Sequence, residues 1–147
     1  MNYPTLFRNY CAEIGLKLTS LRKSILFILW SAEKPLKAYE ILDQLLQIQL
    51  NAKPPTVYRV LDYFVDYGVV HKIESIQSYT LCHEPAEHQA SEVLMVCNDC
   101  HQVNELYDKT MHELVQKLSQ ANHFHLGQGA IELKGVCDKC QSSAVPI

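Results

Sequence analysis

The sequence contains no run of about 18 apolar residues, the length that a helix needs to cross a bilayer. Its first residues, Met-Asn-Tyr-Pro, lack the basic stretch and following apolar stretch of a secretory signal. Neither a glycine-rich phosphate loop nor a Ser-His-Asp arrangement is recognisable. We therefore expect a cytoplasmic protein that is not an enzyme, with no membrane partner and no small-molecule substrate.

The composition is otherwise that of an ordinary globular protein. The chain has 147 residues, of which 48% are hydrophobic and 20% charged, and this length fits one or two small domains. Six cysteines are present. In a reducing compartment disulfides explain them poorly, so metal binding or redox chemistry is the better expectation.

Charge is distributed unevenly along the chain. Residues 1–60 hold eight Lys and Arg against four Asp and Glu, a net charge of +4, whereas residues 61–147 hold five against twelve, a net charge of −7. A basic half suits a polyanion, and an acidic half rich in His and Cys suits cations. A chance distribution of charge stays open as the alternative.

The first 82 residues predict four helices followed by a hairpin. Helical periodicity and end signals place the helices at about 6–14, Ser20–Ala32, Leu36–Leu46 and Pro54 to just before Gly68. Two alternating strands, Val69–Glu74 and Gln77–Leu81, follow around a turn at Ser75-Ile76. Helices that run into a hairpin predict a winged helix, in which the hairpin is the wing.

The fourth helix has the features of a DNA-reading helix. It begins at Pro54-Pro55, where a missing amide hydrogen costs little because first-turn donors are unpaired. Its apolar residues face the core: Val57, Leu61, Phe64 and Val65. Thr56, Tyr58 and Arg59 then lie on or beside the other face, where they can donate to phosphates or base edges. A solvated helix face explains them equally well.

Two C-x2-C pairs are the strongest chemical signal. They are Cys97-x2-Cys100 and Cys137-x2-Cys140. Each pair ends an apolar strand-like run, Val93–Val96 or Ala130–Val136, and a helix is predicted between them at Asp108–Gln120. Four thiolates form a closed structural zinc site. A thioredoxin-like role is the rival, but two pairs without a matching βαβ pattern argue against it. Loss of the metal should unfold this half.

Other Cys and His residues lie outside that cage. Cys82 ends the wing, and the residues that could complete a second, mixed metal site with it are His71, His83, His88 and Glu105. Taken singly, a histidine is more often solvated than ligating, and an isolated cysteine is more often a core residue. On those grounds Cys11 is assigned to the core, and no ligand role is assigned to His101, His112, His123 or His125.

Together these motifs resemble the ferric uptake regulator superfamily over nearly the whole chain. They are Leu18-Thr19-x-x-Arg22, Ala38-Tyr39, Lys53-Pro-Pro-Thr-Val-Tyr-Arg59, Gly68-x-Val70-His71-Lys72, Ser78-Tyr79-x-Leu81-Cys82 and the two C-x2-C pairs. Within the superfamily, Pro-Pro-Thr-Val-Tyr-Arg followed by Ser-Tyr-x-Leu-Cys resembles the zinc uptake regulator branch rather than the iron or peroxide branches.

The resemblance implies an α+β fold with two domains. Residues 1–82 would form a winged-helix DNA-binding domain, and residues 83–147 an α/β dimerisation and metal-binding domain. Two zinc ions per subunit are implied, one structural in the four cysteines and one regulatory. The regulatory ligands it implies are His71, Cys82, His88 and Glu105, with His83 as the substitute for His88. A third family site is expected to be absent, because Glu92-Val-Leu-Met95 replaces its His- and Asp-rich segment.

The resemblance also implies a function. The protein is expected to bind double-stranded operator DNA as a homodimer when loaded with zinc, and to repress zinc-uptake genes. By tying the wing to the second domain, zinc would set the spacing of the two reading helices. Base contacts are expected from Tyr39 and Arg59 with Thr56 and Tyr58 beside them, and phosphate contacts from Arg22, Lys37 and Lys53.

A zinc-ribbon protein-interaction module without DNA would leave the basic N-terminal half unexplained. Beside it, two alternatives remain at this point. An iron- or peroxide-responsive regulator of the same superfamily is the first, although a site that includes a thiolate favours zinc over ferrous iron. The second is a zinc enzyme that does not bind DNA. A catalytic zinc needs an open coordination position, and four candidate protein ligands at the second site imply none.

Overall fold

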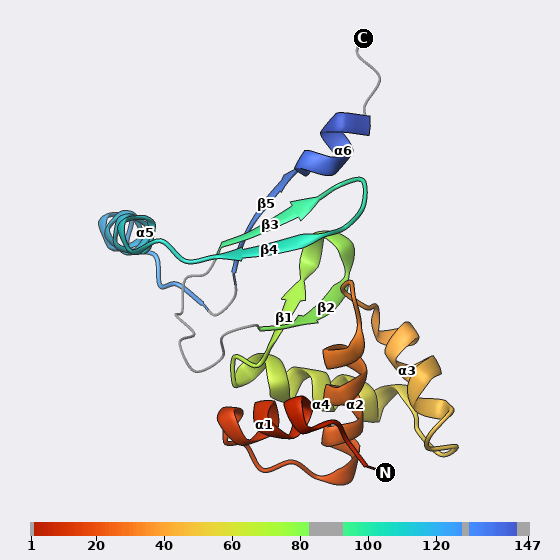
Figure 1. The fold of residues 1–147 in the computed structure, drawn as a ribbon. Coiled ribbons are helices and arrows are strands. Elements are labelled where there is room, and N and C mark those ends of the chain that lie inside the picture. The colour runs from red at the N-terminus through yellow and green to blue at the C-terminus, as the bar shows by residue number, and fades with distance from the viewer. Residues whose placement is uncertain (1, 83–92, 128–129, 144–147) are drawn as a thin grey trace. The chain divides into compact units, whose positions relative to one another are not determined.

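The computed structural model describes residues 2–82, 93–127 and 130–143. The chain divides into two compact units, Met1–Glu87 and His88–Ile147, and each has its own sheet (Figure 1). The boundary predicted between residues 82 and 83 borders a segment outside the described residues. None of the helices in the described ranges has the length and apolar character that crossing a bilayer requires.

The first unit consists of helices that precede a two-stranded wing. Its elements are α1 (Thr5–Ile14), α2 (Ser20–Ser31), α3 (Ala38–Leu46), α4 (Pro54–Asp66), β1 (Val70–Ile73), a 3-10 turn (Glu74–Ile76) and β2 (Ser78–Leu81). Local signals set the helix ends. Gly15 closes α1 in the left-handed region at φ 65°, and the Thr19 side chain caps α2 by accepting from the Arg22 amide at 3.3 Å.

The wing is held to the helices by a short backbone bridge. Strands β1 and β2 pair antiparallel, with Val70 opposite Leu81. Leu36 exchanges two backbone hydrogen bonds with Tyr79, at 2.9 and 2.7 Å. The prediction that Leu36 begins the third helix is therefore wrong. Helix α3 begins two residues later, where the Glu40 carboxylate accepts from the Lys37 amide at 2.9 Å and caps the helix.

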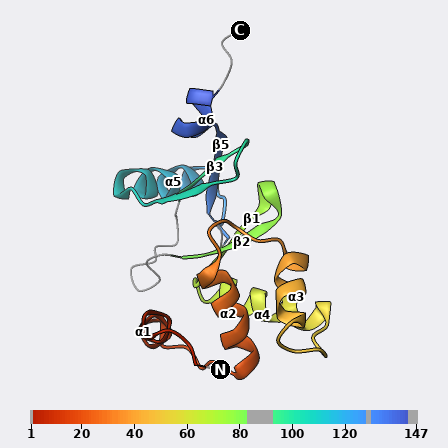
Figure 2. The same ribbon diagram turned by 45° about the vertical axis from the view of Figure 1, so that its right-hand side comes forward.

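The core of this unit fixes the position of α4. Helices α2, α3 and α4 pack against one another, as Figure 2 shows from a second direction. Val57, Val60, Leu61 and Phe64 of α4 are all buried in one apolar cluster with residues of the other helices. Of the residues predicted to face inward, Val57, Leu61 and Phe64 are buried, and Val65 is half-buried against the same cluster. As a result one side of α4 is held by apolar contacts and the other side is exposed to solvent.

The second unit has a three-stranded sheet and two helices. Its elements are β3 (Val93–Cys97), β4 (Val103–Leu106), α5 (Lys109–Ala121), β5 (Ile131–Gly135) and α6 (Asp138–Ser143). The strand order is β4-β3-β5, with β3 antiparallel to β4 and parallel to β5. Neither β4 nor α6 was predicted. Asp108 begins the predicted helix one position outside α5, where it caps the Met111 amide at 3.0 Å.

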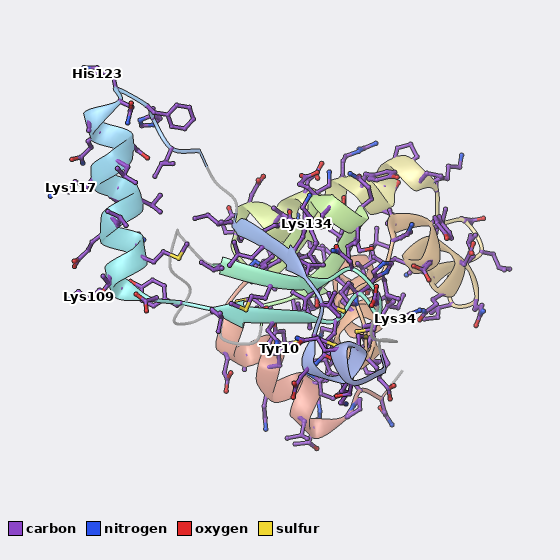
Figure 3. All side chains as sticks on the ribbon, turned by 90° about the horizontal axis from the view of Figure 1, so that it is seen from above. Tyr10, Lys34, Lys109, Lys117, His123 and Lys134 are labelled. Carbon is purple, nitrogen blue, oxygen red and sulfur yellow. The ribbon has the colours of Figure 1, made fainter. Side chains whose placement is uncertain are left out.

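Helix α5 contains no buried residue. Leu114 is 53% exposed and Leu118 is 54% exposed, and Met111 and Val115 complete an apolar strip at helical spacing. Figure 3 shows this helix, with Lys109 and Lys117 labelled on it and His123 just beyond its end, and side chains project around it. An isolated helix of 13 residues is only marginally stable in water, so α5 requires packing that one copy of the described chain does not supply.

The core of the first unit is tested by replacing a leucine of α4. We expect Leu61→Ala to lower the free energy of unfolding by about 2–5 kcal/mol, because it leaves a cavity beneath the helix. Leu61 is fully buried, whereas Leu50 is 88% exposed, so Leu50→Ala is the matched control and should change little. Urea unfolding followed by fluorescence of Trp30, the single tryptophan, reports on this unit. Equal stability of the two variants would contradict the core described here.

Candidate metal centres and nucleic-acid interface

Four cysteines of the second unit lie together. The Sγ atoms of Cys97, Cys100, Cys137 and Cys140 all fall within 4.8 Å of one another. They come from the end of β3, the turn that follows it, the short segment between β5 and α6, and helix α6. None of them forms a disulfide. The parallel pairing of β3 and β5 brings the two C-x2-C pairs together at one end of the sheet, as their positions after two strands predicted.

Backbone groups shape this cluster. The Asn98 amide donates to the Gly135 carbonyl at 2.8 Å, which extends the β3–β5 pairing into the turn. The Cys100 amide and the Cys137 amide both donate to the Cys97 sulfur, at 3.5 and 3.3 Å. His101, at φ 65°, takes the left-handed conformation that closes the turn. The sulfurs are therefore held by the fold itself.

The thiols differ in acidity because they share one small space. Hydrogen bonds from the Cys100 and Cys137 backbone lower the pKa of the Cys97 thiol to about 6. The side chain of Cys137 is the largest influence that raises the pKa of the Cys140 thiol to about 12. Deprotonation of one thiol is favoured, whereas deprotonation of further thiols is unfavourable because negative charges repel at this distance. A cation among the sulfurs removes that repulsion.

The arrangement fits a tetrahedral zinc ion. Four sulfurs at about 2.3 Å from zinc lie about 3.8 Å apart in a regular tetrahedron. The Cys100 and Cys137 sulfurs are 3.7 Å apart. Because zinc binds thiolates without a ligand-field preference, four cysteine sulfurs at these separations suit it as a closed, structural centre.

A second group of metal-binding side chains lies on the wing. His71 on β1 faces Thr80 on β2, and the Cys82 amide donates to the Val69 carbonyl at 2.8 Å. This register puts His71 and Cys82 on the same face of the hairpin as diagonal neighbours. Their ligand atoms lie within 4.8 Å of each other, and the side chains are 7% and 1% exposed. The hairpin thus presents a nitrogen and a sulfur ligand together.

The other ligands predicted for the regulatory site come from other segments of the chain. Glu105 is half-buried on β4 of the second unit, where it faces Leu94 of β3. His88 and its substitute His83 lie outside the described residues. Among the other histidines, His101, His123 and His125 are exposed and His112 is half-buried, and Cys11 packs against the core as predicted.

The exposed side of α4 carries the predicted DNA-reading residues. Tyr58 is 50% exposed, Arg59 is exposed and Thr56 is half-buried in the first turns of the helix. Tyr39, 63% exposed, lies in the first turn of α3. Lys37 and Lys53 are the N-cap residues of α3 and α4. These six side chains belong to the N-terminal ends of two neighbouring helices, where backbone N–H groups favour anions.

Arg22 is placed differently from the other predicted DNA contacts. Its guanidinium carbon lies 3.8 Å from the centroid of the Tyr63 ring, and its Nη1 donates to the Lys17 carbonyl at 3.0 Å. Tyr63 was not singled out from the sequence. Its position in the sequence could have indicated it. Tyr63 follows Arg59 by four residues, so its ring lies one helical turn C-terminal to a predicted base contact.

Comparisons with a family model and with known proteins all indicate the same family. Residues 13–134 match the model of the ferric uptake regulator family. The zinc uptake regulation protein of Escherichia coli (strain K12) is 34% identical over 130 residues, which cover 88% of this chain and 76% of that protein. The ferric uptake regulation protein of Cupriavidus metallidurans is 32% identical over 130 residues, covering 86% of this chain and 88% of that one.

Solved structures agree on the fold. A zinc uptake regulator complexed with zinc and DNA superposes with a TM-score of 0.84 at 31% identity and covers 96% of this chain and 98% of its own. The holo form of XcZur superposes with a TM-score of 0.81 at 35% identity, with coverage of 94% and 98%. The α+β fold predicted from the sequence is thereby confirmed.

The four-cysteine centre is tested by removing one sulfur. We expect Cys100→Ser to lose the zinc of this centre and to melt the second unit at a lower temperature, because structural zinc contributes folding free energy. Zinc content by atomic absorption and the thiolate-to-metal absorption of the cobalt-substituted protein are the measurements. His101→Gln is the control, since it removes a neighbouring, exposed imidazole that has no predicted ligand role and should leave both readings unchanged. Full zinc content in Cys100→Ser would refute the centre.

Proposed function

Because the chain belongs to the ferric uptake regulator family, we propose that it is a zinc-responsive repressor that binds operator DNA as a homodimer. It is a regulator and not an enzyme. The observation that carries the proposal is a proline-opened helix with one exposed face in the basic part of the chain, followed by a cluster of four cysteines in the acidic part. Its proposed targets are zinc-uptake genes, in line with relatives named for zinc uptake.

Recognition of DNA is assigned to the N-terminal ends of α3 and α4. Arg59 can pair its planar fork with two acceptors on guanine, and Tyr39, Tyr58 and Thr56 offer hydroxyls beside it. Lys37 and Lys53, as the N-cap residues, add charge where helix N-termini already attract phosphate. The first unit, residues 1–82 in the sequence prediction, is thus proposed as the DNA-binding domain.

Dimerisation is assigned to the second unit, residues 83–147 of the prediction. The apolar strip of α5 lies open in the described chain, and Leu106 of β4 and Leu133 of β5 are also 44% and 43% exposed. A second copy can cover such surfaces, because a twofold dimer uses the same patch on both subunits. Two copies then present two α4 helices, and a symmetric operator with half-sites one or more helical turns apart matches them.

A second, regulatory zinc is proposed as the switch. Its proposed ligands are His71 and Cys82 of the wing, Glu105 of β4, and His88, for which His83 is the substitute. The support is the pairing of a buried imidazole and a buried thiol on one face of the hairpin. A thiolate in the set favours zinc over ferrous iron. Zinc bound by ligands from both units stabilises one relative arrangement of them, and thereby favours the state that binds DNA.

The alternatives have less support. An iron- or peroxide-responsive regulator does not explain the thiol of Cys82 next to His71. A zinc enzyme requires an open coordination position, whereas the four-cysteine centre fills all four positions with protein sulfur. A cytoplasmic location belongs to the proposal, because operator DNA and reduced thiols are both found there.

The DNA-reading role is tested at Arg59. We expect Arg59→Ala to weaken operator binding by about 5- to 150-fold, the loss of one bidentate base contact of about 1–3 kcal/mol. The measurement is fluorescence anisotropy at a fixed, moderate salt concentration. The probe is a DNA duplex selected from a random pool by the zinc-loaded wild-type protein. Arg8→Ala is the matched control, because that arginine is exposed on α1 and donates to Thr5. Wild-type affinity in Arg59→Ala would remove α4 from the interface.

The regulatory role is tested at Cys82. We expect Cys82→Ser to remain a folded dimer with its four-cysteine zinc, yet to bind operator DNA weakly with or without added zinc. Zinc titrations monitored by anisotropy are compared with Cys11→Ser, which removes a thiol from the same unit and should keep the full zinc response. If Cys82→Ser instead fails to fold, the residue is structural and the proposed switch is wrong.

A further inference from the structure

Arg22 of α2 makes two directed contacts within the first unit. Its guanidinium lies over the ring of Tyr63 of α4, 3.8 Å from the centroid, which is the geometry of a cation–π interaction. Its Nη1 also donates to the carbonyl of Lys17, just before α2, at 3.0 Å. The side chain is half-buried. Arg22 therefore connects the segment before α2 to the side of α4.

Tyr63 lies at a sensitive place on α4. Its ring contacts Phe64, at 5.6 Å between centroids, and Tyr67, at 4.8 Å. Phe64 is fully buried, so the ring borders the core. Tyr63 also follows Arg59 by four residues, and side chains at that spacing are neighbours on one strip of a helix. Tyr63 and Arg59 therefore belong to the same strip of α4.

We propose that Arg22 is a positioning residue for DNA recognition: by clamping Tyr63, it fixes the rotation of α4 and hence the direction of Arg59. This inference rests on the proposed function and adds a residue that acts without contacting DNA. It differs from the phosphate contact that was expected of Arg22 from the sequence.

The clamp supplies what the apolar core of α4 does not. Val57, Val60, Leu61 and Phe64 hold the helix by hydrophobic contacts, which are non-directional. A planar guanidinium stacked on a ring, with one N–H fixed on a carbonyl, has a defined orientation. Bidentate recognition of a base is sensitive to displacements of about 0.5 Å. A directed contact on the flank of α4 therefore influences specificity more than stability.

The proposal is tested with four variants of the full-length, zinc-loaded protein. Arg22→Lys keeps the charge and removes the planar fork, and Arg22→Met removes the charge. Tyr63→Leu removes the ring, while Tyr63→Phe keeps it and serves as the conservative control. The probes are a duplex selected from a random pool by the zinc-loaded wild type and a scrambled duplex of equal length. Affinity is measured for both at several salt concentrations, well below each melting temperature.

The expected result is a loss of specificity without a loss of phosphate contacts. Arg22→Lys and Tyr63→Leu should each lower affinity for the selected duplex about tenfold, as expected when one base contact is misaligned. Affinity for the scrambled duplex and the salt dependence should stay unchanged. The Arg22→Lys and Tyr63→Leu double variant should lose no more than either single one, because both remove the same clamp. Tyr63→Phe should behave like the wild type.

Two results would overturn the proposal. If Arg22 binds phosphate, Arg22→Lys keeps most of the affinity, Arg22→Met weakens both duplexes, and the slope of log affinity against log salt falls by about 0.9. If the clamp is only structural, Tyr63→Leu lowers the melting temperature and leaves the ratio of the two affinities unchanged. A wild type that selects no duplex with zinc is a separate outcome, since it would refute the proposed function itself and, with it, any role of Arg22 in DNA recognition.

Discussion

The four sulfurs that join β3 to β5 are the constraint on which the second unit depends. These strands are parallel neighbours, and α5 and its connections separate them in the sequence. The buried residues described in this unit, Val93, Leu94, Val96 and Cys97, all belong to β3. So small a core does not offset the chain entropy of closing that long connection. Coordination of one zinc ion by both strand ends would add folding free energy where this core is small.

The first unit is stabilised in another way. Its core is a continuous apolar cluster from α1 to β2, and the backbone bridge from Leu36 to Tyr79 ties the wing to it. This unit has no comparable need of metal for its fold. Zinc is therefore a component of structure in one part of the chain and, in the proposed function, a signal in the other. The two roles require ligand sets of different composition, four thiolates against a mixture of nitrogen, oxygen and sulfur.

The sequence predicted what depends on spacing and missed what depends on tertiary contacts. Two C-x2-C pairs at the ends of apolar runs predict a cage because the chemistry of thiolates is local. Pro54-Pro55 followed by helical periodicity predicts α4 for the same reason. Leu36 was misassigned because its partner, Tyr79, lies 43 positions later. The short strand β4 has only Val103 and Leu106 as apolar residues, too few for an alternating pattern.

Arg22 shows most clearly what sequence alone does not predict. An arginine that binds phosphate and an arginine that stacks on an aromatic ring look the same in a basic segment of sequence. Only the position of the Tyr63 ring separates the two roles.

The bare apolar strip of α5 has a consequence for the life of the protein in the cell. A newly made or dissociated subunit leaves Leu114 and Leu118 in water, and the helix gains stability only by mass action when a second subunit is near. Apparent stability therefore rises with protein concentration. A subunit without a partner exposes this helix to proteases. Degradation of such subunits therefore sets a lower limit on the concentration at which the protein persists.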